Sequence, residues 1–186
     1  MMKPAVFLDR DGTLIEERHY LSRPEQVVLY AETIGALKKF DDFGFLLFLV
    51  TNQSGVGRGY FTMEDMAKVH GRLKELLQPA GLSFAEIYIA PESPDQPSAG
   101  RKPSPHFLFQ ARDRFDLDLN RSYMIGDKLI DLQCGWNAGV RQSLLVRTGY
   151  GKEHEMKFRD FLDRAQVVDD MMQAAEWILN DVKDQS

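Results

Sequence analysis

Two kinds of hydrophobic pattern alternate along this chain. Short continuous apolar runs are typical of buried strands, whereas longer segments with apolar residues three or four positions apart are typical of amphipathic helices. The runs predict strands at 5–9, 45–51, 85–90, 122–126 and 142–146, with a further edge strand at 165–169. The longer segments predict helices at about 32–42, 63–79, 105–115 and 128–138, with a closing helix at 171–179.

This alternation of strands and helices predicts the fold class. Strands that are joined by helices lie parallel, and their sheet is covered on both faces. We therefore expect a three-layer α/β/α fold with a Rossmann-like, mainly parallel sheet in one domain that spans residues 1–186. The segment 13–31 is too short for a separate cap domain, so we expect only loops above the sheet edge. Within it, the stretch around His19 is a candidate to fold back over a bound ligand.

Three of the predicted strands end in polar residues that are suited to chemistry. The run AVFL at 5–8 leads into Asp9-Arg10-Asp11-Gly12-Thr13, FLLFLV at 45–50 into Thr51-Asn52-Gln53-Ser54-Gly55, and SYMIG at 122–126 into Asp127. In open α/β sheets, ligands bind at the carboxyl ends of the strands. We therefore expect the three segments to face one crevice.

Asp9 and Asp11 have the spacing expected of a nucleophile and a proton-transfer group. Residues i and i+2 of an extended backbone lie on the same side, and Gly12 lets the chain turn away beneath a ligand. One aspartate can attack phosphorus and form an aspartyl-phosphate, while the other donates the leaving-group proton and then activates water. A lone Asp-x-Asp also fits a solvated strand-to-loop junction, so the assignment depends on the other segments.

The remaining segments complete a phosphate site in outline. The small polar residues of segment 51–55 can cradle a phosphate with hydroxyl and backbone N–H groups. Two aspartates, a backbone carbonyl, the phosphate and waters suit Mg²⁺, which would neutralise the charge between phosphate and carboxylates. Lys102 precedes a predicted helix and can stabilise the transferring group, although a lysine considered alone is more often a solvated surface charge.

The order of the segments, DxDGT, then a hydrophobic run with TNQSG, then RKP, then GDKxxD, resembles the haloacid-dehalogenase superfamily of aspartate-nucleophile phosphatases. More narrowly, FLDRDGT, VTNQSGVGRG, RKPSP, SYMIGDKLID and LVRTG are similar to D-glycero-D-manno-heptose 1,7-bisphosphate 7-phosphatases and the related histidinol-phosphate phosphatases. The resemblance covers roughly residues 5–150. Each motif is weak alone, but their joint order is very specific, and it implies a haloacid-dehalogenase-like fold.

The resemblance also implies a role for each matching residue at the strand ends. Asp9 would be the nucleophile and a Mg²⁺ ligand, and Asp127 would be the remaining carboxylate ligand. Asp11 would be the general acid and base, and its backbone carbonyl would also meet the metal. Thr51 and the backbone of Asn52 would hold the transferring phosphoryl group.

Further cations and one acid surround this expected centre. The resemblance implies that Lys102 supports the phosphoryl group from the opposite side, and that Arg58 and Arg101 contact the substrate beyond it. A guanidinium fork suits phosphate oxygens, although Arg58 also fits a solvated Gly-rich turn. We assign Lys128 to substrate binding as well, and expect Asp131 to orient Lys128 or the metal region. These cations favour a bisphosphorylated sugar as substrate.

One stretch departs from the family pattern. Many members hold zinc with a Cys-x-His and a Cys-x-Cys pair before RKP, whereas the corresponding positions here read Ala90-Pro91-Glu92 and Ser98-Ala99-Gly100. These residues cannot form a thiolate site, so we expect no zinc and a loop at 91–100 that is shaped by its prolines. The difference leaves open the choice between a heptose bisphosphate and histidinol phosphate.

Composition limits the kinds of partner. The 186 residues are 44% apolar and 27% charged, which suits one globular unit with a full core. A net charge of −5 argues against a nucleic-acid surface, and no apolar stretch approaches the roughly 20 residues that span a bilayer. We expect a cytoplasmic monomer that acts on a small phosphorylated sugar and binds neither nucleic acid nor membrane. The single cysteine, Cys134, is expected to be a buried packing residue.

The function implied by the resemblance is Mg²⁺-dependent removal of the 7-phosphate of D-glycero-D-manno-heptose 1,7-bisphosphate through an aspartyl-phosphate, in the synthesis of lipopolysaccharide or S-layer precursors. A histidinol-phosphate phosphatase is the alternative activity. A non-catalytic phosphate-binding module is the alternative from another class. The complete set of Asp9, Asp11, Thr51, Lys102 and Asp127 argues against that module, because a binding protein would be free to lose at least one of them.

Overall fold

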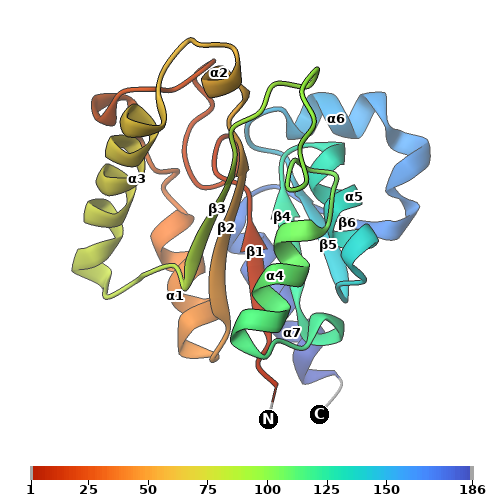
Figure 1. Cartoon of the computed structure of the whole chain (residues 1–186). Coiled ribbons are helices and arrows are strands. Elements are labelled where there is room, and N and C mark those ends of the chain that lie inside the picture. The colour runs from red at the N-terminus through yellow and green to blue at the C-terminus, as the bar shows by residue number, and fades with distance from the viewer. Residues whose placement is uncertain (1, 185–186) are drawn as a thin grey trace.

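Six strands form one sheet in the order β3-β2-β1-β4-β5-β6 in the computed structural model, which describes residues 2–184 (Figure 1). Every neighbouring pair in the sheet is parallel. The strands are β1 (Ala5–Leu8), β2 (Leu46–Asn52), β3 (Glu86–Ala90), β4 (Tyr123–Gly126), β5 (Gln142–Val146) and β6 (Ala165–Val168). The predicted parallel sheet is confirmed, and the apolar run at 165–169 is an edge strand as expected.

Within the described residues 2–184, seven α-helices connect and cover these strands. They are α1 (Thr33–Asp42), α2 (Ser54–Gly57), α3 (Met63–Leu77), α4 (His106–Phe115), α5 (Leu129–Ala138), α6 (Gly151–Lys157) and α7 (Met171–Lys183). Four short 3-10 helices lie between them, η1 (Pro24–Gln26), η2 (Gln78–Ala80), η3 (Leu119–Arg121) and η4 (Arg159–Arg164). The helix predicted at 63–79 ends as an α-helix at Leu77, because Pro79 has no N–H to continue the hydrogen-bond ladder.

The helices form two layers, one on each face of the sheet (Figure 1). Because successive strand residues point to opposite faces, Val6 and Leu8 of β1 belong to the core beneath α1, α3 and α7, whereas Ala5 and Phe7 belong to the core beneath α4 and α5. All four side chains are fully buried. The three-layer α/β/α prediction is therefore correct, and Cys134 of α5 is a buried free thiol as expected.

The strand order places a crevice above β1. The chain proceeds from β1 through β2 to β3 on one side of the sheet, and from β4 to β6 on the other. Leu8, the last residue of β1, pairs in register with Leu49 of β2 and with Ile125 of β4. In Figure 1 the carboxyl ends of these strands point upward, away from both chain termini. Ligands bind at such a reversal of strand order, so β1, β2 and β4 define where the site lies.

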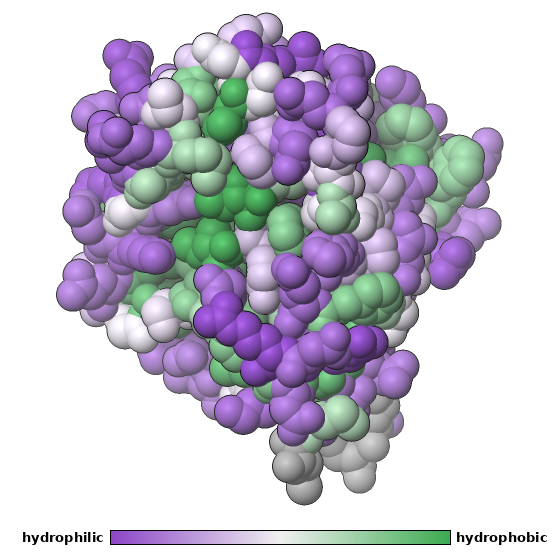
Figure 2. Space-filling model, in the orientation of Figure 1, coloured by the Kyte–Doolittle hydropathy of each residue, from purple (hydrophilic) through white to green (hydrophobic). Residues whose placement is uncertain are grey.

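Loops with little regular structure cover the carboxyl ends of the strands. Between β1 and α1, residues 9–32 contain only the short helix η1, and α2 follows β2 directly. Figure 2 shows a mainly hydrophilic surface with an apolar strip where the edge strand β3 lies in Figure 1. Within residues 2–184, no helix has both the length and the apolar composition that crossing a membrane requires.

Candidate active site

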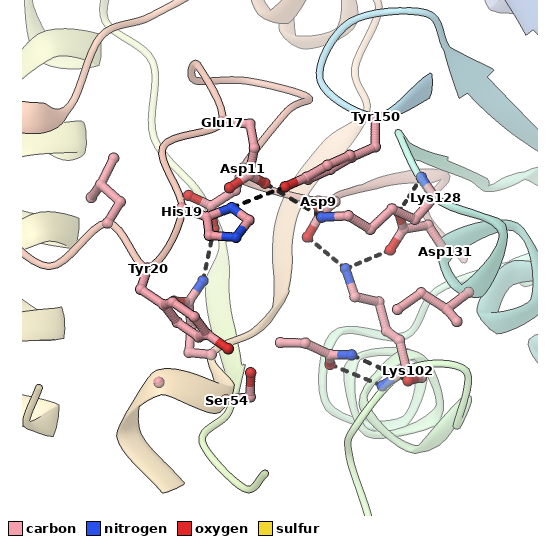
Figure 3. Close-up of a pocket in the computed structure, with 15 residues that line it drawn as sticks. Asp9, Asp11, Glu17, His19, Tyr20, Ser54, Lys102, Lys128, Asp131 and Tyr150 are labelled. Atoms are coloured by element: carbon pink, nitrogen blue, oxygen red, sulfur yellow. Dashed lines mark hydrogen bonds and ion pairs between the residues drawn. The ribbon is translucent and has the colours of Figure 1, made fainter. Parts of the chain in front are cut away.

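A cavity of about 320 Å³ opens above the carboxyl ends of the central strands (Figure 3). Of the residues assigned from the sequence, Asp9, Asp11, Asn52, Lys102 and Lys128 line it directly. Segments that are far apart in the chain therefore meet here, in the one crevice that the strand ends were expected to face. Other assigned residues lie just behind this lining or beside it.

Lys102 forms the centre of the cavity floor. Its Nζ atom lies 2.6 Å from Oδ1 of Asp9 and 2.7 Å from Oδ1 of Asp131, and it donates to the backbone oxygen of Val50 at 2.7 Å (Figure 3). Lys102 is 3% exposed, and these three acceptors inside the protein match its three ammonium protons. Burial alone would lower the pKa of Lys102, but the carboxylates of Asp131 and Asp9 outweigh it and raise the pKa above its ordinary value. The lysine is therefore a fixed positive charge beside Asp9, and not the solvated surface cation of the alternative interpretation.

Asn52 fixes the loop that carries this lysine. Its side-chain amide donates to the backbone oxygen of Lys102 at 3.1 Å, and its side-chain oxygen accepts from the Lys102 N–H at 3.0 Å. Asn137 of α5 donates to the oxygen of Pro103 at 3.0 Å, and the Lys102–Pro103 peptide bond is cis. The sequence suggested a role for the Asn52 backbone, whereas the structure shows that its side chain joins the end of β2 to the loop that carries Lys102.

Asp127 lies fully buried at the end of β4. Its Oδ2 atom accepts from the backbone N–H of Tyr150 at 2.9 Å, but its Oδ1 atom has no hydrogen-bond partner among the described residues. Burial raises the pKa of Asp127 well above its ordinary value; Lys128 opposes this shift, and the negative charge of Asp9 adds to it. Gly12 has a φ of +81°, and a side chain there would collide with Asp127 Oδ2, so only glycine fits this close approach.

The carboxylates fit a divalent cation. Asp9, Asp127 and Asp131 each offer an oxygen atom, and these atoms lie within 4.8 Å of one another. Asp131 already accepts from Lys102 with one oxygen and from the N–H of Lys128 with the other, at 2.9 Å. Asp9 and the unpartnered oxygen of Asp127 therefore remain as the oxygens best placed to hold a cation, and hard oxygen ligands are those that Mg²⁺ prefers.

The carboxylate of Asp11 accepts hydrogen bonds from two side chains that the sequence analysis did not connect with it. Arg10 donates from Nε to Oδ2 of Asp11 at 3.1 Å and from Nη2 to Oδ1 at 3.0 Å. Gln53 donates to the same carboxylate at 2.9 Å and to the hydroxyl of Thr51 at 2.7 Å. The available signal was strand alternation, which points Arg10 to the opposite side from Asp9 and into the core, where a charge needs a partner.

The roof of the cavity comes from two loops. His19 and Tyr20 line it, so the segment after Asp11 does fold over the site as predicted. Across the opening, Nδ1 of His19 lies 3.1 Å from the Tyr150 hydroxyl (Figure 3). Glu17 lies 3.4 Å from Nζ of Lys128, which sits 4.6 Å from the centre of the Tyr150 ring.

Glu17 and Tyr150 were missed in the sequence, where no motif marks them. Burial raises the pKa of Glu17, whereas the positive charge of Lys128 lowers it. Lys128 is thus shared between the roof and the floor, because its Nζ also lies 3.8 Å from Oδ1 of Asp127. The predicted link between Asp131 and Lys128 is present as the backbone hydrogen bond described above.

Arg58 and Arg101 lie beside the cavity, and neither belongs to its lining. Arg101 donates to the backbone oxygen of Glu92 at 3.0 Å, and Arg58 is exposed in the turn after α2. Burial lowers the pKa of Arg101, and the positive charge of Arg58 lowers it further. Each arginine lies close in the chain to residues that line the cavity, Arg101 next to Lys102 and Arg58 shortly after Gly55.

Polar contacts among its own residues shape the loop at 91–100. The Ser98 hydroxyl donates to the carboxylate of Glu92 at 2.6 Å and accepts from the N–H of Arg101 at 3.1 Å. Gln96 accepts from the N–H of Ser93 at 2.8 Å. The loop thus carries Arg101 on a framework of side-chain and backbone hydrogen bonds in addition to its prolines.

Comparison with known protein sequences agrees with the family that the motifs resemble. A family model described as HAD-hydrolase-like matches residues 99–174. A D-glycero-beta-D-manno-heptose-1,7-bisphosphate 7-phosphatase of Mesorhizobium japonicum is 41% identical over 77% of this chain and 69% of its own length. A D-glycero-D-manno-heptose-1,7-bisphosphate 7-phosphatase of Thermosynechococcus vestitus is 36% identical over 96% of both chains.

Comparison with solved structures agrees with the sequence comparison. The crystal structure of D,D-heptose 1,7-bisphosphate phosphatase from B. bronchiseptica, complexed with magnesium and phosphate, superposes with a TM-score of 0.88 at 29% identity. The match covers 97% of this chain and 99% of that protein. A HAD-like phosphatase from Mesorhizobium loti superposes with a TM-score of 0.74 at 39% identity, over 78% and 73% of the two chains.

Proposed function

Because this chain belongs to the haloacid-dehalogenase-like phosphatases, in the family of D-glycero-D-manno-heptose-1,7-bisphosphate 7-phosphatases, we propose that it removes the 7-phosphate of that heptose bisphosphate. The observation that carries the proposal is the buried floor, where Lys102 is held between Asp9 and Asp131 beside the unpartnered oxygen of Asp127. This arrangement fixes the orientation of a carboxylate beside a cation, as nucleophilic attack on phosphorus requires. The following paragraphs take each role in turn.

Asp9 is the nucleophile in this proposal. One of its oxygens is engaged by Lys102, which leaves the other to attack phosphorus. The fixed ammonium group also lies where it can offset negative charge on the transferring group without reorganisation. Thr51, whose hydroxyl accepts from Gln53, and the backbone of Asn52 hold the phosphoryl oxygens.

Asp11 transfers the protons. It gives a proton to the sugar oxygen as the phosphorus–oxygen bond to the sugar breaks, and it takes a proton from the water that then displaces Asp9. Its side chain lines the cavity and keeps a firm orientation through Arg10 and Gln53. The two aspartates therefore divide attack and proton transfer between them.

Mg²⁺ is the proposed cofactor, bound by the carboxylates of Asp9 and Asp127 and by the backbone carbonyl of Asp11. When bound, it supplies positive charge that screens the phosphate from the carboxylates. The B. bronchiseptica phosphatase named above is complexed with magnesium and phosphate, which supports this assignment. We propose no zinc at the loop 91–100, whose residues offer serine and carbonyl oxygens in place of thiolates.

Arg58, Arg101 and Lys128 are the proposed contacts to the rest of the substrate. Arg58 and Arg101 lie beside the opening, where their charges suit the second phosphate of a bisphosphate. Lys128 lies in the cavity wall and can meet the sugar between the two phosphates. We further propose that residues 1–186 form one catalytic domain without a cap, which acts as a monomer in the cytoplasm.

Measured phosphate release tests this proposal. The heptose 1,7-bisphosphate, histidinol phosphate and fructose 1,6-bisphosphate would be compared with Mg²⁺ and with EDTA. We expect Mg²⁺-dependent release that favours the heptose bisphosphate, and we expect Arg58→Ala to raise its KM about 10-fold, since charged hydrogen bonds are worth about 1.5–3 kcal/mol. Preference for histidinol phosphate would move the protein to that activity, and no release from any ester would favour a binding module.

The matched control for Arg58→Ala is Arg72→Ala. Arg72 lies on α3 and pairs with Glu75 at 3.2 Å, away from the cavity. Its removal deletes the same charge and is expected to leave the KM for the bisphosphate unchanged. Equal effects of the two substitutions would mean that net charge, and not a second phosphate contact, determines the KM.

A further inference from the structure

Arg10 is a charged side chain with no exposed surface. It lies between Asp9 and Asp11 in the chain and is 0% exposed, which makes it the largest fully buried side chain among the described residues. An unpaired buried charge is expensive, so a buried arginine persists only where partners satisfy it. The identity of those partners indicates what the arginine does.

Two groups of partners hold the guanidinium, one on each side. Toward the cavity, Nε and Nη2 meet the two oxygens of Asp11 in a bidentate pair, at 3.1 and 3.0 Å. Toward α3, Nη1 lies 2.7 Å from Sδ of Met66 and 3.0 Å from Nε2 of His70. The guanidinium therefore bridges the acid/base aspartate and a helix that contributes no residue to the cavity lining.

His70 can serve only as an acceptor in this contact. A guanidinium has donors and no acceptor, so Nε2 of His70 must present its lone pair and the ring proton must lie on Nδ1. Burial lowers the pKa of His70 to about 3, and the positive charge of Arg10 adds to the shift, so the ring is neutral at physiological pH. A neutral ring in a fixed tautomer therefore holds the guanidinium of Arg10 in one orientation.

We propose that Arg10 is a positioning residue for Asp11, and that His70 and Met66 of α3 in turn fix the orientation of Arg10. A bidentate fork sets the plane as well as the distance of a carboxylate, which a point charge cannot do. The proposal rests on the proposed phosphatase function, because it concerns the proton that Asp11 transfers. It predicts that Arg10 affects only those steps in which Asp11 exchanges a proton.

Leaving-group chemistry separates those steps from the rest of the reaction. When a sugar phosphate reacts, Asp9 forms a bond to phosphorus, the bond to the sugar oxygen breaks, and the proton of Asp11 passes to that oxygen. With 4-nitrophenyl phosphate the same bonds form and break, but 4-nitrophenolate departs as a stable anion and takes no proton. The parameter kcat/KM reports this first transfer in both cases, so their ratio measures the contribution of the acid.

The experiment compares kcat/KM for the heptose bisphosphate and for 4-nitrophenyl phosphate in Arg10→Lys, His70→Leu and His70→Gln. We expect Arg10→Lys to reduce the sugar-phosphate value about 10- to 100-fold, and the nitrophenyl value less than about 3-fold, because general acids contribute about 100-fold or more. His70→Leu should show the same selective loss to a smaller degree. His70→Gln, which restores an acceptor, should recover the wild-type ratio.

Arg141→Lys is the matched control. Arg141 forms a bidentate pair with Asp181 at 2.5 and 2.9 Å near the amino end of β5, at the opposite edge of the sheet. The same chemical change there should leave the ratio of the two kcat/KM values unchanged. Binding of inorganic phosphate with Mg²⁺, followed by calorimetry, should be unaffected by Arg10→Lys, since it needs no proton transfer.

The outcomes separate the inference from the proposed function. A selective loss on the sugar phosphate, with phosphate binding intact, supports the positioning role. An equal loss on both esters in Arg10→Lys and His70→Leu would overturn it and leave Arg10 as a structural ion pair. Failure of the wild-type protein to hydrolyse either ester would overturn the proposed function and the positioning role together.

Discussion

The floor and the roof of the cavity are built in different ways. On the floor, Asp9, Lys102, Asp127 and Asp131 are nearly inaccessible to solvent: Asp9 and Asp127 follow strands, Asp131 lies in the first turn of α5, and Lys102 lies in a loop that Asn52 fixes. On the roof, His19 is exposed and meets Tyr150 through a single contact between two loops. Charges that are buried and paired are strongly coupled to the fold, whereas exposed loop contacts are weak. We therefore expect the floor to determine the reaction and the roof to affect mainly substrate binding.

The largest expected effect is the loss of the proposed nucleophile, Asp9, from the floor. Asp9→Asn should reduce phosphate release by at least about 10,000-fold, as removal of a catalytic nucleophile does in other enzymes. Stability should change little, because Lys102 keeps Asp131 and the Val50 carbonyl as partners. Release assays and calorimetric binding of inorganic phosphate measure the two consequences. Activity within 10-fold of the wild type would assign the nucleophile to another residue.

Lys102→Met should damage both the chemistry and the fold. It leaves the buried carboxylates of Asp9 and Asp131 without their shared cation, and breaking a buried ion pair costs about 3–5 kcal/mol of unfolding free energy. Urea denaturation would measure the loss. Lys152→Met, on the exposed surface of α6, is the matched control and should change stability by less than about 0.5 kcal/mol. Similar losses in both would contradict a special role for the floor.

Metal binding should depend on the floor carboxylates and not on those of the roof. Mg²⁺ at 100 times its Kd should stabilise the wild-type protein by about 2.7 kcal/mol through mass action. Asp127→Asn should remove this gain, because it replaces the unpartnered carboxylate oxygen with an amide. Glu17→Gln makes the same chemical change in the roof and should retain the gain. Thermal unfolding with and without Mg²⁺ decides between these expectations.

The buried His70 behind Arg10 allows the site to be tested with pH. The pKa of His70 is lowered to about 3 in the folded protein, so the unfolded chain binds an extra proton between that value and about 6.5. Stability should therefore fall as the pH is lowered through this window, by up to roughly 1 kcal/mol per pH unit. His70→Gln should reduce this dependence in urea denaturation at pH 7 and pH 5.

The smallest effect is expected in the roof itself. Tyr150→Phe removes the hydroxyl that meets His19 but keeps the ring beneath Lys128. An exposed neutral hydrogen bond is worth about 0.5–1.5 kcal/mol, so we expect at most an about 10-fold rise in KM and an unchanged kcat for a phosphate monoester. Steady-state kinetics would check this. A large fall in kcat would show that the roof takes part in the chemistry.

Most of the fold and of the floor could be predicted because they follow local patterns. Continuous apolar runs located the strands, and helical apolar spacing located five of the helices, although α7 continues beyond the predicted 179 to Lys183. The short helices α2 and α6 were not predicted. Asp9, Asp11 and Asp127 stand directly at strand ends, so predicting the parallel sheet also predicted their meeting. The family resemblance added Lys102, which composition alone would have placed on the surface.

The side chains that orient these groups were not predictable in the same way. Glu17 and Tyr150 lie in no pattern that differs from an ordinary loop, and strand alternation for Arg10 or the polar segment 51–55 for Gln53 does not indicate their partners. Their roles depend on contacts over long chain separations, such as Arg10 with His70 or His19 with Tyr150. Such contacts are products of helix and loop packing, and neither periodicity nor motif spacing contains them.

By itself, the sequence determined the parallel α/β architecture, the identity of the carboxylates at the strand ends and the family to which the chain belongs, because each depends on local spacing or on an ordered set of motifs. Only the tertiary structure decided which partners each charge has. It placed Lys102 between Asp9 and Asp131, left one oxygen of Asp127 without a hydrogen bond, and joined Asp11 through Arg10 to α3. The physical reason is that the energy of a buried charge depends on the few atoms within hydrogen-bond distance, and folding alone brings those atoms together.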